Sequence, residues 1–511
     1  MLKPDNRRAS ASRFVLQTAV AALLTGCLLP NAPLNFVISM REFGARRTSA
    51  QILTLPDSQE GTAVDITPQG GLLALANPSS ERPTRVQFTV AGGSVKAGYE
   101  LLQSEAPPLS DAGFEVRLRT TEHRWLKTIK QRRPVYRIKN SRAIKRGDTE
   151  SFWVIRDVGN DGIVETKIEA RAAVVGERCV IFLDEKINAP NFESAAKEIA
   201  NAFDEQIFPT NVRLFGAPIA PDGVATPIIS LLLSPAVGNY GSDTTIGYFS
   251  LRDLFPASGD PDSPLAFSNE RLILYISPFV VAAGRPADYL GTIAHELQHL
   301  INASRKLLLN PPDEERGPES LWLDEMLSMI AMSMNGYGIE SSSQVLFSHV
   351  AGFLDNPGAF SLTQWDLNPE ASAYGAAYLF GNYLIERLGT DLLKELVDSP
   401  EIDLQNLENR LKKRDTDFKT IFGEWALATI LDGTALSDNP KHQYKNLDLL
   451  GGSGRRRLYG VLLDPIPMPI RASINLKPTS LRCLVLPPQR AGRYDFILTG
   501  GAHQAFLVVP Q

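Results

Sequence analysis

The chain has 511 residues, a formal net charge of −5 and 21% charged residues. That length exceeds what one hydrophobic core serves, so two or three domains are expected. The modest acidic charge describes an ordinary soluble surface and excludes the strongly basic surface typical of nucleic-acid-binding proteins. We therefore expect no nucleic-acid partner.

Residues 1–26 have the features of a bacterial lipoprotein signal peptide. Arg7, Arg8 and Arg13 precede the apolar run 14–24, which is short for a membrane span. The run ends in Leu-Thr-Gly-Cys at 24–27, which resembles a lipobox and implies cleavage before Cys27 and lipidation of that residue. An ordinary signal peptide with a chance cysteine is the alternative. The sequence thus predicts an exported protein held to a membrane through Cys27, at the outer membrane if the host has one.

Residues 27–175 are expected to form a β-rich N-terminal domain with a basic connector. Short apolar runs alternate with turn signals, and Val86–Val90 is a strand candidate. From Arg117 to Arg146 there are twelve Lys or Arg residues and one acid, Glu122. A solvated strand pair or flexible connector is the simpler interpretation, and contact with anionic lipid or polymer is the alternative.

Residues 176–431 are expected to form the central domain and 432–511 a small β-rich C-terminal domain. Periodicity predicts strands at 179–183, 228–233 and 272–276 and an amphipathic helix at 192–208, with helical patterns continuing to about residue 431. Short strands separated by Pro and Gly turns return from 457 to 511. The predicted fold class is α+β, with a mostly helical central domain containing a small sheet.

The most informative motif is His295-Glu296-Leu-Gln-His299. Apolar residues recur around it at helical spacing, and Pro286 suits a helix start. Positions i and i+4 share one helix face, so the two imidazoles can bind one Zn²⁺ ion. Glu296 is offset from that face and can act as a base on a water molecule at the metal without being a ligand. The alternative is a helix whose histidines are ordinary surface or core residues.

A second helical segment, Trp322 to Ser328, contains the candidate third ligand. A catalytic zinc usually takes three protein ligands and leaves one position open. Glu325 can supply the third, and Asp324 is the competing candidate. The Met-rich stripe of this segment is expected to lie in the core.

Together these segments resemble the gluzincin metallopeptidases, thermolysin among them, and within that group the hyicolysin family. The resemblance covers roughly residues 150–430 and is carried by 247–249 with Asp253, 268–271, 292–299, 322–328 and 374–380. It implies a gluzincin-like fold, zinc bound by His295, His299 and Glu325, and Glu296 as the general base. It also implies that Tyr374, at the start of a helix, donates to the oxyanion; Tyr374 and Tyr378 as core aromatics are the alternative.

The chain departs from thermolysin at Met329, where thermolysin has an Asp that orients a ligand His. The partner of the zinc histidines must therefore come from elsewhere, and Asn302 is one candidate. The chain also lacks the Gly-x-Met-Glu-Asn segment with which aminopeptidase relatives capture a free amino terminus, which favours an endopeptidase.

The sequence thus predicts a lipid-anchored zinc metalloendopeptidase acting on protein or peptide substrates. A non-catalytic, zinc-holding surface lipoprotein that serves as a binding or adhesive protein is the alternative. Cys179 and Cys483 lie in apolar, strand-like runs, where buried thiols or a disulfide are both possible outcomes.

Overall fold

The structure is a computed structural model of the 511-residue chain. It describes residues 38–511 except for 46, 68, 92–112, 127–143, 160–161, 188–190, 224–226, 238–244, 310–317, 366–370, 453–455, 466–469, 487–491 and 501–502. The signal-peptide segment and Cys27 lie outside the described residues. Within the described part of the chain, every helix is too short or too polar to cross a membrane.

The chain divides into two compact units. One contains residues 108–352 and 365–417, and the other contains 1–107, 353–364 and 418–511. Helices and multi-stranded sheets are both present, which confirms the predicted α+β class.

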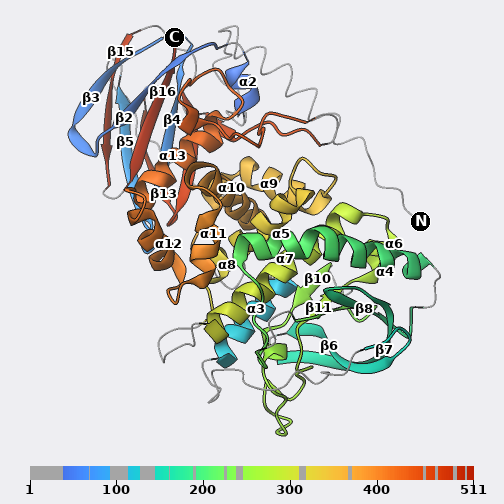
Figure 1. Ribbon diagram of the computed structural model, residues 1–511. Helices are drawn as coiled ribbons and strands as arrows, with labels where there is room; N and C mark the ends of the chain where they lie inside the picture. Colours follow the sequence, from blue (N-terminus) through green and yellow to red (C-terminus); the bar gives the residue numbers. More distant parts are fainter. Residues whose placement is uncertain are drawn as a thin grey trace, which may run out of the picture. The chain divides into compact units, whose positions relative to one another are not determined.

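The first unit is built on a six-stranded mixed sheet in the order β10-β11-β9-β8-β7-β6 (Figure 1). Its strands are β6 (Thr149–Gly159), β7 (Gly162–Val175), β8 (Cys179–Asp184), β9 (Ile229–Leu233), β10 (Gly247–Phe249) and β11 (Ile273–Ile276). Strands β8, β9 and β11 are parallel, and β10 runs antiparallel at one edge. The parallel strands are buried throughout, which explains their unbroken apolar sequences.

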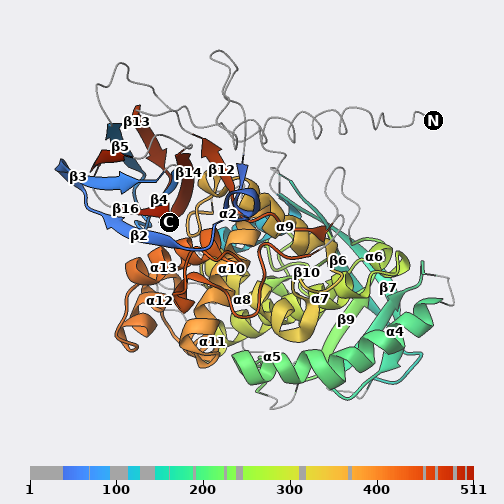
Figure 2. The same cartoon turned by 90° about the horizontal axis from the view of Figure 1, so that it is seen from above.

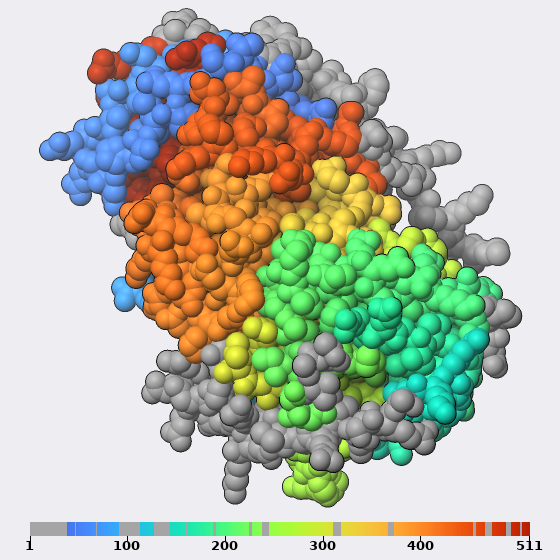
Figure 3. Space-filling view, in the orientation of Figure 1, coloured from blue at the N-terminus to red at the C-terminus, as the bar shows by residue number. Residues whose placement is uncertain are grey.

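Ten helices accompany this sheet in the described residues. They are α3 (Phe114–Leu126), α4 (Asn191–Ala202), α5 (Phe208–Phe215), α6 (Pro278–Ala282), α7 (Pro286–Ser304), α8 (Leu321–Met332), α9 (Gln344–Asp355), α10 (Ala371–Leu388), α11 (Asp391–Asp398) and α12 (Asp403–Lys412). Helix α8 packs against both α7 and α10, and the three lie side by side in Figures 1 and 2. Helices α4 and α5 form part of the surface of this unit (Figure 3).

A glycine brings α7 close to the edge strand. A Cβ atom on Gly247 of β10 would lie 2.7 Å from the Tyr275 carbonyl oxygen and 3.0 Å from Thr292 of α7. Any larger residue would push the helix away. Gly247 therefore lets the helix with the HExxH motif lie directly against β10.

The second unit is a β-sandwich made from both ends of the chain. Its sheets have the orders β1-β12-β14-β4-β16-β2 and β13-β5-β15-β3. The strands are β1 (Ile38–Ser39), β2 (Ala50–Leu55), β3 (Ser58–Ile66), β4 (Gly71–Asn77), β5 (Thr84–Ala91), β12 (Leu462–Pro465), β13 (Ile470–Leu476), β14 (Ser480–Leu486), β15 (Gly492–Thr499) and β16 (Gln504–Pro510). One apolar core joins the inner faces of both sheets, and α2 (Met40–Gly44) and α13 (Phe418–Leu431) complete the unit.

This arrangement differs from the predicted domains. The sequence indicated separate β-rich domains at 27–175 and 432–511, but strands from these two segments pair with one another within the same sheets. Residues 113–175, in turn, contribute α3, β6 and β7 to the unit with the HExxH helix. Pairing between distant strands leaves no local trace in the sequence, because each strand's pattern reports only which face is buried.

Both described cysteines are buried free thiols. Burial raises the pKa of Cys179 and of Cys483 well above the ordinary value for a thiol. Cys179 and Cys483 therefore do not form a disulfide in the structure.

Candidate metal centre

Helix α7 presents two histidines to one point. Pro286 occupies its first turn, and Asp288 accepts hydrogen bonds from Ser343 and from the Gln344 backbone, which fixes the start of the helix. His295 and His299 lie one turn apart, with their Nε2 atoms 3.0 Å from each other. Both residues are buried.

Glu325 of α8 completes a cluster with these histidines. Its Oε2 atom lies 3.2 Å from His295 Nε2 and 3.6 Å from His299 Nε2. The Glu325 side chain is 0% exposed, and neither of its carboxylate oxygens has a hydrogen-bond partner among the described residues. Such a buried carboxylate is costly unless a cation compensates its charge.

The three atoms fit a tetrahedral zinc ion. Ligands bound at 2.0–2.1 Å in a tetrahedron lie about 3.4 Å from one another, and the separations here are 3.0, 3.2 and 3.6 Å. Burial lowers the pKa of His299, but the negative charges of Asp324 and Glu325 raise it by more, so that the pKa of His299 lies well above its usual value. The cluster therefore stabilises positive charge, as a cation site must.

Asp324 orients one of these histidines. Its Oδ2 atom lies 2.8 Å from His299 Nδ1, while Asn302 donates to its Oδ1 atom at 2.5 Å. With its proton on Nδ1, His299 directs the Nε2 lone pair at the metal position. Asp324, the competing ligand candidate, is thus placed to orient His299, as an Asp at a different sequence position does in thermolysin. Asn302 contacts Asp324 and acts on the histidine only through it.

Glu296 lies beside the cluster. Its Oε2 atom accepts a hydrogen bond from the Phe249 backbone of β10 at 2.8 Å and lies 3.4 Å from Arg119 Nη2. Burial, followed by the charge of Glu115, raises the pKa of Glu296 well above its ordinary value. A carboxylate with a raised pKa is a stronger base than an ordinary one.

Tyr374 and Tyr378 of α10 have different surroundings. The Tyr374 ring packs against His349 and Trp365, with ring centroids 5.3 and 4.9 Å away. Burial, then the charge of Glu325, raises the pKa of Tyr374, so its hydroxyl keeps its proton at pH 7. Tyr378 instead accepts a hydrogen bond from the Ile339 backbone and contacts Ser333, which is a structural role.

His349 of α9 was not singled out from the sequence. Burial, then the charge of His295, lowers its pKa to about 4, so the imidazole is neutral at pH 7. Its Nδ1 atom is buried without a hydrogen-bond partner among the described residues. Its only signal in the sequence was the scarcity of histidine, six in the whole chain.

Helix α3 also reaches this site, which the sequence did not predict. Residues 117–126 belong to the basic segment interpreted above as a solvated strand pair or connector, but the structure folds them as a helix with Arg119 and Glu122 buried. Of the remainder, 127–143 lie outside the described residues. Buried partners, rather than solvent, satisfy the charges of Arg119 and Glu122.

Segments 247–253 and 268–271 are joined to each other by hydrogen bonds beside the metal cluster. Asp253 is buried and accepts hydrogen bonds from the Tyr275 hydroxyl at 2.6 Å and the Asn269 backbone at 2.7 Å. These contacts fix the chain that follows β10. Their role is structural, because neither Asp253 nor Asn269 belongs to the metal cluster.

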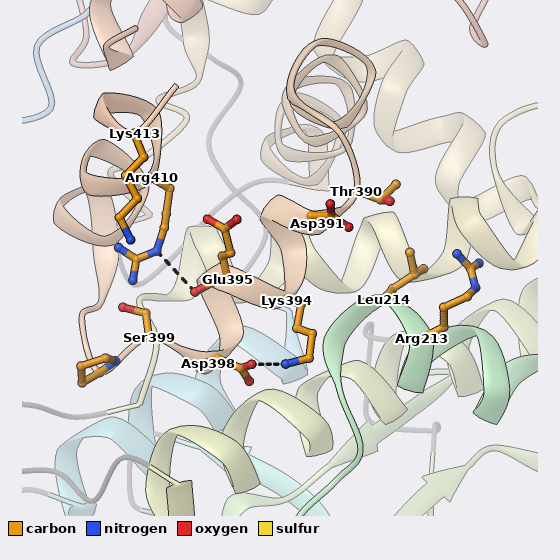
Figure 4. A pocket seen from close by; sticks show the side chains of 11 residues that line it. Arg213, Leu214, Thr390, Asp391, Lys394, Glu395, Asp398, Ser399, Arg410 and Lys413 are labelled. Atoms are coloured by element: carbon orange, nitrogen blue, oxygen red, sulfur yellow. Dashed lines mark hydrogen bonds and ion pairs between the residues drawn. The ribbon is translucent and has the colours of Figure 1, made fainter. Parts of the chain in front are cut away.

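A separate polar pocket lies between α5, α11 and α12 (Figure 4). Among its lining residues, Lys394 pairs with Asp398, and Arg410 donates to the Glu395 carbonyl. It shares no residue with the metal cluster.

Comparison with known proteins agrees with this chemistry. The chain is 28% identical over 250 residues to the neutral metalloprotease ShpI of Staphylococcus hyicus. The alignment covers 46% of this chain and 52% of that protein, so the chain spans about half the length of the relative it matches. No family model matches the chain. The similarity, together with the buried His-His-Glu cluster, supports a metallopeptidase.

Proposed function

We propose that this chain is a zinc-dependent endopeptidase of the hyicolysin type. The observation that carries the proposal is the buried trio of His295, His299 and Glu325. The carboxylate oxygens of Glu325 have no hydrogen-bond partner among the described residues. Glu296 stands beside the trio with a raised pKa. A metal site with an adjacent base is the arrangement that peptide hydrolysis requires.

A bound zinc ion would supply Lewis acidity toward the substrate carbonyl and a lowered pKa for water. Glu296 takes the proton from the attacking water and returns it to the leaving amine. The Phe249 amide and Arg119 hold the Glu296 carboxylate in place for this transfer. Tyr374 donates its hydroxyl proton as a hydrogen bond to the negative charge that develops on the carbonyl oxygen.

Metal analysis combined with cleavage of casein tests this proposal. We expect about one zinc per chain, as three buried ligands imply, and cleavage that a chelator abolishes and added zinc restores. Absence of stoichiometric zinc after refolding with metal present would overturn the site.

A variant of Glu296 separates chemistry from binding. Glu296→Gln keeps the shape of the side chain and removes its basicity, so it should retain zinc and lose about three powers of ten or more in cleavage rate. Near-wild-type cleavage would contradict the role of Glu296. Zinc held tightly by a protein that cleaves nothing would favour a non-catalytic surface protein.

We also propose export and lipid anchoring through Cys27, from the sequence of residues 1–27. Two or more acyl chains are needed to hold a protein stably at a membrane. Wild-type protein should partition into detergent, whereas Cys27→Ser should lose the lipid. Mass spectrometry of the mature amino terminus decides the matter, because an unmodified terminus cut elsewhere would indicate a plain secreted protein.

A further inference from the structure

Helix α3 is a fixed wall of the metal site. Phe114 and Leu118 are buried in a core cluster formed with the sheet, where the Phe114 ring lies 5.3 Å from that of Tyr248. Just beyond β10, the Leu251 amide donates to Glu122 of the helix at 2.8 Å. Buried apolar and polar contacts thus hold α3 in place, so that the side chains of its first turn have defined positions.

Arg119 directs its charge to Glu296 and Glu122. Its guanidinium lies 3.4 Å from Glu296 Oε2 and 3.2 Å from Glu122 Oε2. The Phe249 amide also donates to Glu296 Oε2, at 2.8 Å. Both of these contacts use the same oxygen of Glu296, so the other oxygen, Oε1, is the one available to carry a proton.

Glu115, in the first turn of α3, brings a second carboxylate to this base. One oxygen of Glu115, a ring nitrogen of His295 and an oxygen of Glu296 all lie within 4.8 Å of one another. The Oε1 atom of Glu115 is buried and has no hydrogen-bond partner among the described residues. A buried carboxylate oxygen is costly unless a donor or a positive charge satisfies it. A donor that the substrate brings would therefore be stabilised here.

Hydrolysis of a peptide bond creates such a donor. The scissile C–N bond breaks after the oxygen of water has bonded to the carbonyl carbon. Water supplies two protons: Glu296 passes one to the leaving nitrogen, and the other, released by the new carboxyl group, makes the amine an ammonium at neutral pH. Because Glu296 must reach this nitrogen to deliver the proton, the nitrogen also comes close to Glu115.

We propose that Glu115 is a further catalytic residue, which binds the leaving nitrogen through its carboxylate and stabilises the positive charge that forms there as the C–N bond breaks. The inference rests on the proposed zinc peptidase function. It gives the two carboxylates separate tasks: Glu296 moves the proton, and Glu115 accepts the hydrogen bonds of the new amine. Helix α3 stays docked throughout, because the same helix carries the Arg119 that holds Glu296.

Comparing a peptide with its ester analogue tests this role. Mass spectrometry of a casein digest identifies a cleaved peptide, and the analogue has oxygen in place of the scissile nitrogen. An alcohol leaves from the ester without positive charge, so only the amide needs Glu115. Glu115→Gln should lower kcat/KM by about 10–100-fold for the amide, as expected for loss of a charged hydrogen bond, and by less than about threefold for the ester.

A matched control and a metal assay accompany this comparison. Glu205→Gln removes an exposed carboxylate outside the metal cluster and should leave both rates unchanged. Equal losses on amide and ester in Glu115→Gln, or no loss on either, would overturn the proposal. Loss of zinc from Glu115→Gln would overturn it as well, because Glu115 would then serve metal binding rather than the leaving group.

Binding of the amine product gives a readout that does not depend on turnover. The carboxyl-terminal fragment of the same peptide carries the new amino terminus, whereas its N-acetylated form lacks the positive charge. Calorimetry with the zinc-loaded full chain should show that the wild type binds the free amine at least about tenfold more tightly than Glu115→Gln does. The acetylated fragment should bind equally to both. Equal binding of the free amine would contradict the role of Glu115.

The activity of the wild type separates this proposal from the one on which it rests. A wild type that holds zinc and cleaves casein, beside a Glu115→Gln variant with equal losses on amide and ester, would remove Glu115 from the reaction and leave the peptidase proposal intact. A wild type that lacks zinc, or that cleaves neither casein nor the ester, would overturn the peptidase proposal itself.

Discussion

Asp324 and Glu325 are neighbours on α8 with different partners. Glu325 points between the two histidines, whereas Asp324 contacts His299 from behind and accepts a hydrogen bond from Asn302. The sequence could place both carboxylates near the metal, because they follow one another on a helix that packs against α7. Helical spacing alone could not rank their roles, since that depends on how α8 is rotated against α7; the family resemblance was what favoured Glu325 as the ligand.

Substitution should separate the two roles. Glu325→Gln removes a charged ligand and should abolish stoichiometric zinc binding. Asp324→Asn leaves the three ligands but loses the charged acceptor for His299, so zinc affinity should fall by about 10–100-fold. Competition with a chromophoric chelator measures both. If Asp324→Asn lost zinc more completely than Glu325→Gln, the assignment of the third ligand would be reversed.

Tyr374 and Tyr378 form a second matched pair. Tyr374→Phe removes the proposed oxyanion donor and should lower kcat by about 10²-fold with little change in KM. Tyr378→Phe removes a hydroxyl bonded to the Ile339 backbone and should cost about 1 kcal/mol of stability while kcat stays near the wild-type value. Steady-state kinetics on a peptide, beside thermal unfolding, compares them. Equal effects on kcat would assign the oxyanion contact elsewhere, with His349 as the next candidate.

Among the elements, α10 depends on a glycine for its close approach to α9. A Cβ atom on Gly375 would lie 2.2 Å from the His349 carbonyl oxygen, which no real side chain tolerates. Gly375 follows Tyr374 directly, so the contact that brings the helices together also sets where the tyrosine ring meets His349.

Gly375→Ala should therefore disturb both stability and the site. Overpacking of this kind costs about 1–3 kcal/mol, and the shift of α10 should move Tyr374 and lower kcat. Gly259→Ala is the control, because a Cβ there meets nothing within 4 Å. Chemical denaturation measures the free energy of unfolding, and an unchanged value for Gly375→Ala would contradict the close approach.

Local elements were predictable where the pattern of a short segment decides them. Strands predicted at 179–183, 228–233 and 272–276 appear as β8, β9 and β11, and the helix predicted from 192 appears as α4 followed by a π-helical turn and α5. Helix α3 was not predictable in the same way. Its charged residues were expected to face solvent. In the structure Glu122 bonds to Ser250, 128 residues away in the sequence, and Arg119 bonds to Glu296, 177 residues away.

At the scale of the whole molecule, strand pairing in the β-sandwich predicts that neither end of the chain folds without the other. In the segment 432–511, strands β13 to β16 pair with β2, β3, β4 or β5 from the other end of the chain. A fragment of residues 432–511 should therefore remain unfolded alone, with poorly dispersed amide signals in NMR spectra, and gain structure when co-expressed with residues 38–91. A well-dispersed spectrum for the fragment alone would support the independent C-terminal domain that the sequence indicated.

Strand β16 pairs with β2 on one side and with β4 on the other. Those two partners are made early in synthesis, and the whole HExxH-containing unit is made before β16 appears. Ribosomal synthesis is slow relative to the folding of a single domain, so the HExxH-containing unit can fold while β2 and β4 still have unpaired edges. Such edges invite aggregation. The sandwich closes only when residues 504–510 pair with both β2 and β4, and a chain that lacks them would expose those edges to chaperones and quality-control proteases.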